Sequence, residues 1–141
     1  MKSAVVAVII ISLAGLIGCS GNIQGVVRQD AKRMEFAYQE STTGDGSLQT
    51  VLPDGERFEG EFVEVSSYIE QTGTSSTDTS GEIARYDAVD EYSGNRDAVL
   101  HGDRGHMMKC RFKLTDVFMG IAGGGYGICQ ISDGRVIDLF F

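Results

Sequence analysis

The chain has 141 residues, with 12 Lys and Arg against 20 Asp and Glu, so its formal net charge at pH 7 is −8. This length fits a single domain. The acidic balance argues against a nucleic-acid-binding function, because phosphate binding depends on Lys and Arg side chains that release counterions. With 19 glycines, one proline and 42% hydrophobic residues, the composition indicates a folded, turn-rich protein rather than a disordered one.

The first twenty residues have the pattern of an export signal. Lys2 supplies a positive start, and the apolar stretch 4–17 that follows is interrupted only by Ser12 and Gly15. This stretch is shorter than the roughly 20 residues that a membrane-spanning helix needs. Its length and flanks are instead typical of the core of a secretory signal peptide.

A more specific motif ends this stretch. Leu16-Ile17-Gly18-Cys19 resembles the lipobox of bacterial lipoproteins, in which an aliphatic residue and two permissive positions precede a cysteine. The resemblance implies that the signal peptide, residues 1–18, is removed. It also implies that the thiol of Cys19 carries diacylglycerol and that its new amino group is usually acylated. The alternative is an ordinary cleaved signal peptide with a chance cysteine.

The lipobox predicts where the protein works. Two or more acyl chains anchor a protein stably to a membrane, so we expect a lipid-anchored protein of the cell envelope whose partners include the membrane. Ser20 stands where an Asp would favour retention at the inner membrane of a Gram-negative lipoprotein. If the host is Gram-negative, the resemblance therefore favours the outer membrane.

Behind Cys19 we expect a lipidated tether, residues 19–30, and then one soluble domain, residues 31–141. The domain has the two-residue periodicity of half-buried strands, as in Met34, Phe36 and Tyr38, and turn signals separate its apolar segments. This pattern predicts a mainly β fold, a small antiparallel barrel or sandwich of about seven short strands. The predicted strands cover residues 33–39, 48–52, 57–65, 98–101, 106–114, 126–131 and 135–141.

Three local features are less regular. Val63 and Val65 fall on the opposite parity from Phe58 and Phe62, which predicts a bulge or a change of face near Phe62. The polar tract within residues 66–81 reads as a loop. Residues 83–92 read as a short helix or an irregular strand.

Cys110 and Cys129 are the two cysteines that remain once Cys19 is assigned to the lipid. Both lie in predicted strands on faces that we expect to point inward. An exported protein meets an oxidising compartment, where such pairs form disulfides. We therefore expect a structural disulfide, with two separate buried thiols as the alternative.

The glycine-rich segment 115–125 contains our candidate binding surface. Phe118, Met119 and Ile121 are apolar within a predicted loop, and Tyr126 follows directly after it. These side chains either close the end of the hydrophobic core or form an exposed contact patch. We expect any protein partner in the envelope to bind here.

The sequence offers little for catalysis or cofactors. His101 and His106 flank a turn, but their spacing matches no metal-binding signature. The sequence has no nucleophile-elbow motif, and the glutamates of the stretch 56–64 look exposed rather than paired. We therefore expect no catalytic residues, no metal and no cofactor.

Together these features favour a non-enzymatic binding or structural module anchored in the cell envelope. A compact lipoprotein that inhibits a foreign enzyme or excludes a phage is the alternative. An envelope hydrolase is the third alternative, for which the sequence offers no recognisable set of catalytic residues.

Overall fold

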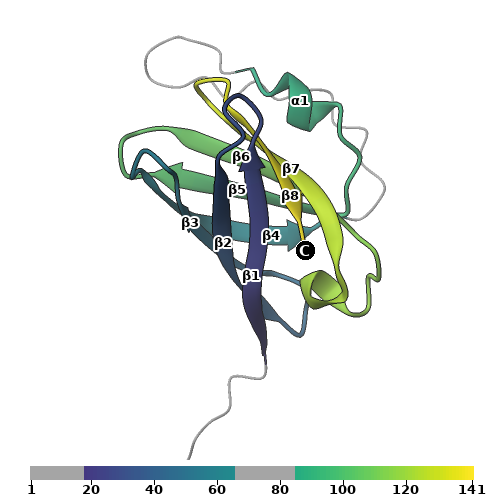
Figure 1. Cartoon of the computed structure of the whole chain (residues 1–141). Coiled ribbons are helices and arrows are strands. Elements are labelled where there is room, and N and C mark those ends of the chain that lie inside the picture. The colour runs from purple at the N-terminus through teal and green to yellow at the C-terminus, as the bar shows by residue number, and fades with distance from the viewer. Residues whose placement is uncertain (1–17, 66–84) are drawn as a thin grey trace, which may run out of the picture.

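Eight antiparallel strands follow one another around a closed barrel in a computed structural model of the chain, which describes residues 18–65 and 85–141 (Figure 1). Each strand pairs with its neighbours in sequence, and β8 closes the barrel by pairing with β1. The prediction of a mainly β fold is confirmed, and of the two expected architectures the barrel is right. The strands are β1 (Gly18–Val27), β2 (Arg33–Ser41), β3 (Gly46–Val51), β4 (Arg57–Glu64), β5 (Arg96–Gly102), β6 (Met107–Leu114), β7 (Gly125–Ile131) and β8 (Val136–Phe140).

The strand missing from the predicted set is β1. The expected tether, residues 19–30, is not a linker in the structure, because residues 19–27 pair with β2 on one side and, in part, with β8 on the other. Glycines hide the alternation of this strand in the sequence. A Cβ on Gly21 would lie 3.1 Å from the ring of Tyr38, and one on Gly25 would lie 3.0 Å from Ile137. These glycines make room for large neighbours inside the barrel.

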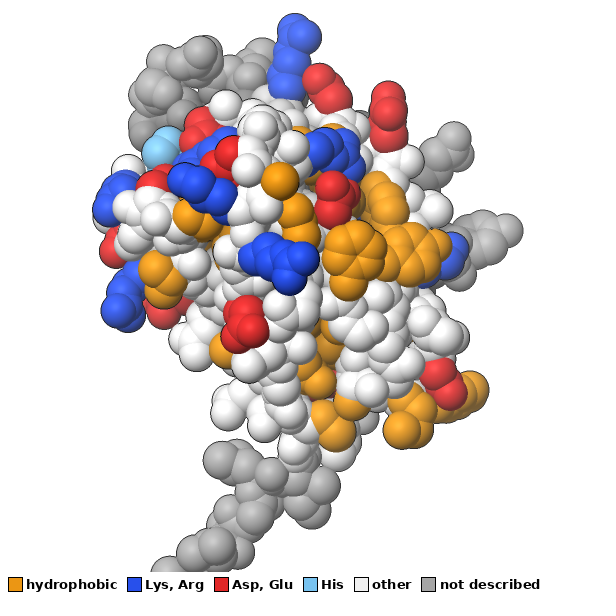
Figure 2. All heavy atoms as spheres, in the orientation of Figure 1, with side chains coloured by type: hydrophobic (Ala, Val, Ile, Leu, Met, Phe, Trp, Pro, Cys, Tyr) orange, Lys and Arg blue, Asp and Glu red, His pale blue; other side chains and the backbone are white. Residues whose placement is uncertain are grey.

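The interior of the barrel is filled with apolar side chains. In β2 and β6 every second residue is buried, as the two-residue period of a strand requires. The largest fully buried side chains are Phe36, Phe58, Phe62, Phe112, Ile23, Leu48, Leu100, Met108, Ile121, Ile131, Ile137 and Leu139. On the face of the molecule in Figure 2, charged side chains lie mostly over the upper and left parts, and hydrophobic ones gather at the right and lower right. The fold is therefore held by one packed core that runs through the barrel.

The bulge expected near Phe62 does not form. The β4–β5 register runs without interruption through Phe62 opposite Ala98 and Val63 opposite Asp97. Val63 points outward and is half exposed. The change of parity in the sequence therefore reflects an apolar residue on the outer face and not a change in backbone geometry.

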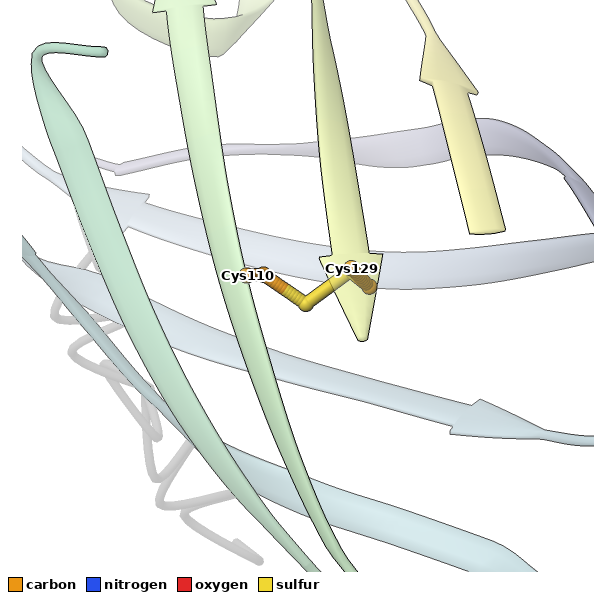
Figure 3. Close-up of a disulfide and its surroundings, with 2 residues drawn as sticks. All are labelled: Cys110 and Cys129. Carbon is orange, nitrogen blue, oxygen red and sulfur yellow. A yellow bond between two sulfur atoms is a disulfide. The ribbon is translucent and has the colours of Figure 1, made fainter. Parts of the chain in front are cut away.

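Cys110 and Cys129 form the expected disulfide. The two residues lie directly opposite each other on β6 and β7, with their Cα atoms 4.0 Å apart (Figure 3). Both are buried in the core. The bond links the neighbouring strands β6 and β7 inside the barrel, as a structural disulfide does.

A short helix, α1 (Asp87–Asp90), covers part of the outer face of the barrel. Its Val89 and the preceding Tyr86 pack against Ile128 of β7 and Val136 of β8. Of the two readings of residues 83–92, the helix is thus correct for 87–90. The loop expected at 66–81 and all of the expected signal peptide except Gly18 lie outside the described residues. Within the described ranges no helix is long and apolar enough to cross a membrane.

Candidate functional site

The two ends of the barrel differ in chemistry. At one end β1 begins, beside the β2–β3 turn and the connection between β6 and β7, which contains the 3₁₀ helix η1 (Gly120–Gly123) (Figure 1). We call this end the Cys19 mouth. The opposite end, which we call the turn end, carries the β1–β2, β3–β4, β5–β6 and β7–β8 turns. The Cys19 mouth holds a groove with apolar and buried charged groups, whereas the turn end holds a network of ion pairs.

Cys19 lies on the inner face of the sheet at the mouth. It is directly opposite Glu40 in the β1–β2 ladder, and opposite residues in a ladder share a face. Its thiol is free and exposed. Burial raises the pKa of Tyr38, and the nearby Glu40 and Cys19 raise it further. Cys19, the residue that the sequence predicts to be lipidated, is thus accessible at the rim of the barrel.

Glu40 is a buried carboxylate at this mouth, with only 6% of its surface exposed. Its Oε2 accepts the backbone N–H of Ile121 at 2.8 Å, whereas its Oε1 has no hydrogen-bond partner among the described residues. Gly120 has a φ of +62°, and a Cβ there would collide with the carboxylate. Glu40 therefore ties β2 to η1, and one of its oxygens is left for a further contact.

Arg96 brings a buried positive charge to the same mouth. It is 2% exposed, its Nη1 donates to the carbonyl of Asn95 at 3.1 Å, and the same atom lies 3.5 Å from Oε1 of Glu64. Within the part of the chain that the structure describes, its Nε has no hydrogen-bond partner. Buried polar atoms of this kind are rare in folded proteins. Glu40 and Arg96 are therefore the polar groups at this mouth with capacity for another ligand or water.

A groove of about 530 Å³ joins these groups to an exposed apolar segment. It is lined by Cys19, Glu40, Arg96 and the residues 117–119, among others. Phe118 is fully exposed, Met119 is 60% exposed and Val117 is half exposed. In Figure 2 hydrophobic side chains gather at the lower right, in the region where Figure 1 draws η1. The mouth thus combines an accessible thiol with protruding apolar side chains.

The structure divides the predicted binding surface into three parts. Phe118 and Met119 form the exposed patch at the mouth, whereas Ile121 is buried and closes the end of the core. Tyr126 points outward from the side wall, where its ring meets that of Tyr92 edge-on at 6.0 Å. The loop therefore closes the core through Ile121 and exposes Phe118 and Met119, while Tyr126 belongs to a separate surface.

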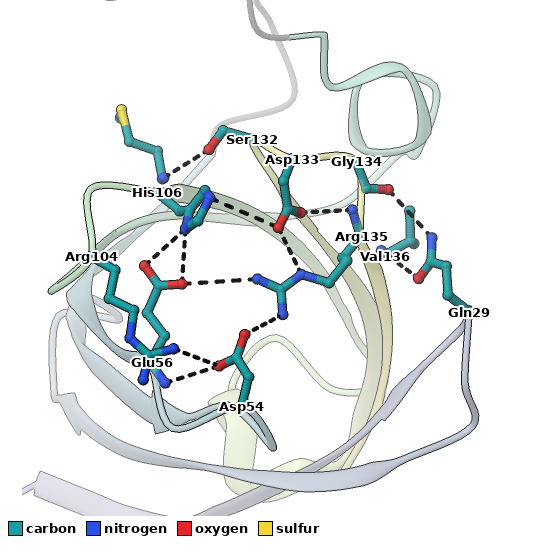
Figure 4. A network of polar contacts seen from close by, with 11 residues as sticks. Gln29, Asp54, Glu56, Arg104, His106, Ser132, Asp133, Gly134, Arg135 and Val136 are labelled. Atoms are coloured by element: carbon teal, nitrogen blue, oxygen red, sulfur yellow. Dashed lines mark hydrogen bonds and ion pairs between the residues drawn. The ribbon is translucent and has the colours of Figure 1, made fainter.

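The turn end is closed by charged side chains (Figure 4). Glu56 is buried, and its carboxylate lies 2.9 Å from Nδ1 of His106 and 3.8 Å from Nη2 of Arg135. Arg135 also bonds Asp133 and Asp54, each at 2.8 Å. Although burial opposes it, contacts with these two aspartates raise the pKa of Arg135. The network holds three turns together over the end of the core.

Glu56 corrects the expectation that the glutamates of 56–64 are all exposed. It shares the inward parity of Phe58 and follows a turn in which its own N–H bonds to Asp54 at 2.9 Å. Glu59 and Glu61 do point outward, whereas Glu64 is exposed but lies opposite Arg96 in the β4–β5 ladder, at the rim of the Cys19 mouth. His106 contacts carboxylates through both ring nitrogens, with Nε2 3.9 Å from Asp133. These contacts make His106 part of the ion-pair network at the turn end.

His101 lies apart from this network, on the outer wall of the barrel. It lines two adjoining open grooves of about 780 and 770 Å³, together with Asn22, Ala37, Gln49 and Glu59. The two histidines that flank the β5–β6 turn thus face different surroundings. Among the described residues no group of three His, Cys, Asp or Glu side chains is placed to hold a metal ion.

Comparisons with known proteins add no family to these observations. Neither protein-family models, nor curated proteins, nor solved structures give a significant match to this chain.

Sequence reasoning missed Glu40 and Arg96, although a signal for both was present. Glu40 continues the inward alternation of Met34, Phe36 and Tyr38, and Arg96 precedes Ala98 and Leu100 in the same way. A charged residue that continues the inward-facing alternation of a strand can therefore indicate a buried charge at the end of the barrel.

Proposed function

We propose that this protein is a lipid-anchored cell-envelope barrel, acylated at Cys19, that acts as a non-enzymatic binding or structural module. One observation carries the proposal: the cysteine that ends the lipobox is a free, exposed thiol on the rim of the barrel. Acyl chains on this thiol would leave the core in place. In the envelope of a Gram-negative host, the outer membrane is the expected location.

The packing of the barrel supports a role carried out at the surface. Four phenylalanines and eight aliphatic or methionine side chains fill the interior, all less than 2% exposed. A barrel that carries a small molecule needs room inside for it. The candidate contact regions are instead the Cys19 mouth, the polar grooves of the outer wall and the charged turn end.

The decisive experiment is the intact mass of the full chain after expression in a bacterium and purification from its membranes. We expect a chain that begins at Cys19 and carries the mass of diacylglycerol and a further acyl chain. The Cys19→Ala variant is expected to lose these groups and to leave the membrane fraction. An uncleaved 141-residue chain with a Cys19 thiol that reacts with alkylating reagents would overturn the proposal.

An inhibitor of a foreign enzyme, or an exclusion factor, is the second candidate, and the exposed Phe118 is the observation that favours it. A protruding aromatic residue on a fixed loop suits insertion into the pocket of a partner. This function predicts a tight complex with one soluble protein that weakens at least tenfold in Phe118→Asp. A Tyr126→Ala variant should bind normally, because Tyr126 lies on another surface.

A further inference from the structure

We propose that the Cys19 mouth is the membrane-facing end of the protein, and that residues 117–119 enter the lipid surface beside the acyl chains of Cys19. This inference rests on the acylation proposed above. It adds an orientation and a second membrane contact, which a lipid anchor alone does not require.

The first step is the absence of a spacer between the anchor and the barrel. A flexible tether of residues 19–30 could have reached about 40 Å, enough to let the domain turn freely above a membrane. In the structure Cys19 is already paired with Glu40, and Ser20 with Gln39. Lipid attached to Cys19 would therefore start at the rim, and the mouth would lie against the headgroups.

The second step is the chemistry of the surface that this position presents to the lipid. Val117, Phe118 and Met119 line the same groove as Cys19, and all three expose about half or more of their surface. Exposed apolar side chains next to an anchor gain free energy by entering the interfacial region of a bilayer. A protein partner at this mouth would first have to displace the membrane that the anchor holds there.

The third step is that the segment is held in its protruding shape. Oδ1 of Asp116 accepts the backbone N–H groups of Phe118 at 2.9 Å and Met119 at 3.3 Å. On the other side Ile121 is buried in the core and its N–H is bound by Glu40. Asp116 thus fixes the local turn and Ile121 fixes the following residues to the barrel, which leaves Phe118 exposed.

The chain contains no tryptophan, so a single introduced tryptophan reports on one position. We would compare Phe118→Trp with Val51→Trp as the matched control. Val51 is also exposed (50%), but it is the last residue of β3 and lies at the turn end. Both proteins, purified from membranes in acylated form, would be placed in phosphatidylcholine vesicles with and without brominated phosphatidylcholine.

We expect Trp fluorescence of Phe118→Trp to shift to the blue in vesicles and to lose at least half of its intensity to the brominated lipid. Val51→Trp should keep its solvent-exposed spectrum. Equal, unquenched spectra for the two variants, in protein whose mass shows acylated Cys19, would overturn the orientation and leave the anchor intact. A mass without acyl chains would overturn both proposals. A blue shift without vesicles that grows with protein concentration would show a contact between copies and would also overturn the lipid contact.

Discussion

Cys19 and Glu40 lie directly opposite each other at the first rungs of the β1–β2 ladder. Glu40 in turn accepts the N–H of Ile121, which lies 81 positions further along the chain. The proposed anchor point, a buried carboxylate and the connection that carries Phe118 are therefore parts of one structural unit. Changes to this unit should affect both the stability of the barrel and the surface that it presents.

Gly120 is the position where this unit should be most sensitive. Its left-handed backbone costs a non-glycine residue about 1–2 kcal/mol, and a Cβ would also collide with the Glu40 carboxylate. We expect Gly120→Ala to lower the free energy of unfolding by more than this amount in urea titrations. Gly105→Ala is the control, because Gly105 has a φ of +92° but nothing within 4 Å of its Cβ position. Equal losses in the two variants would contradict the contact.

Glu56 should contribute strongly to the turn end. Replacement by Ala removes the hydrogen bond that the carboxylate accepts from Nδ1 of His106 and the charge beside Arg135, and a hydrogen bond to a charged group is worth about 2 kcal/mol. We expect a loss of about this size for Glu56→Ala in urea unfolding. Glu59→Ala, on the exposed face of the following strand, should change stability by less than about 0.5 kcal/mol. Similar values for both variants would show that the network is not stabilising.

Asp54 should contribute to resistance against acid. The N–H of Glu56 lowers the pKa of Asp54 below its ordinary value of 3.8, against the effect of burial, and Arg135 lowers it further. A carboxyl whose pKa is lower in the folded state stabilises the fold above its unfolded pKa and loses this effect as the pH falls through the folded value. We expect Asp54→Asn to reduce the urea midpoint at neutral pH, with a difference that begins to shrink as the pH approaches 3.8 and is lost as the pH falls through the lower, folded pKa. A difference that is constant with pH would contradict this assignment.

The disulfide should be a large part of the total stability. In the chain-entropy model a bond that closes a loop with a sequence separation of 19 contributes about 3 kcal/mol. We expect the Cys110→Ala/Cys129→Ala variant, in a Cys19→Ser background, to lose about this amount in urea unfolding. Dithiothreitol should destabilise the Cys19→Ser protein and leave the triple variant unchanged. An effect of dithiothreitol on the triple variant would show that it acts elsewhere.

The alternation of apolar and polar residues was enough to predict most of the strands. It failed for β1, where glycines occupy inward positions and the alternation is lost. The alternation of Met108, Cys110, Phe112 and Leu114 is a strong signal because each inward position is apolar. In β1 the inward positions include Gly21 and Gly25, whose role is visible only beside Tyr38 and Ile137. The sequence therefore predicts a linker over residues that pair as β1 in the structure.

The sequence by itself determined the β class and the two cysteines available for a disulfide, and it carries the resemblance to a lipobox at Cys19, because each of these depends on residues close together in the chain. The tertiary structure alone decided that β8 closes on β1, that Cys110 faces Cys129, and that Glu40, Arg96 and Phe118 meet around Cys19. These contacts depend on the register between strands that are distant in sequence. Register is set by the packing of the whole core, which no single segment contains.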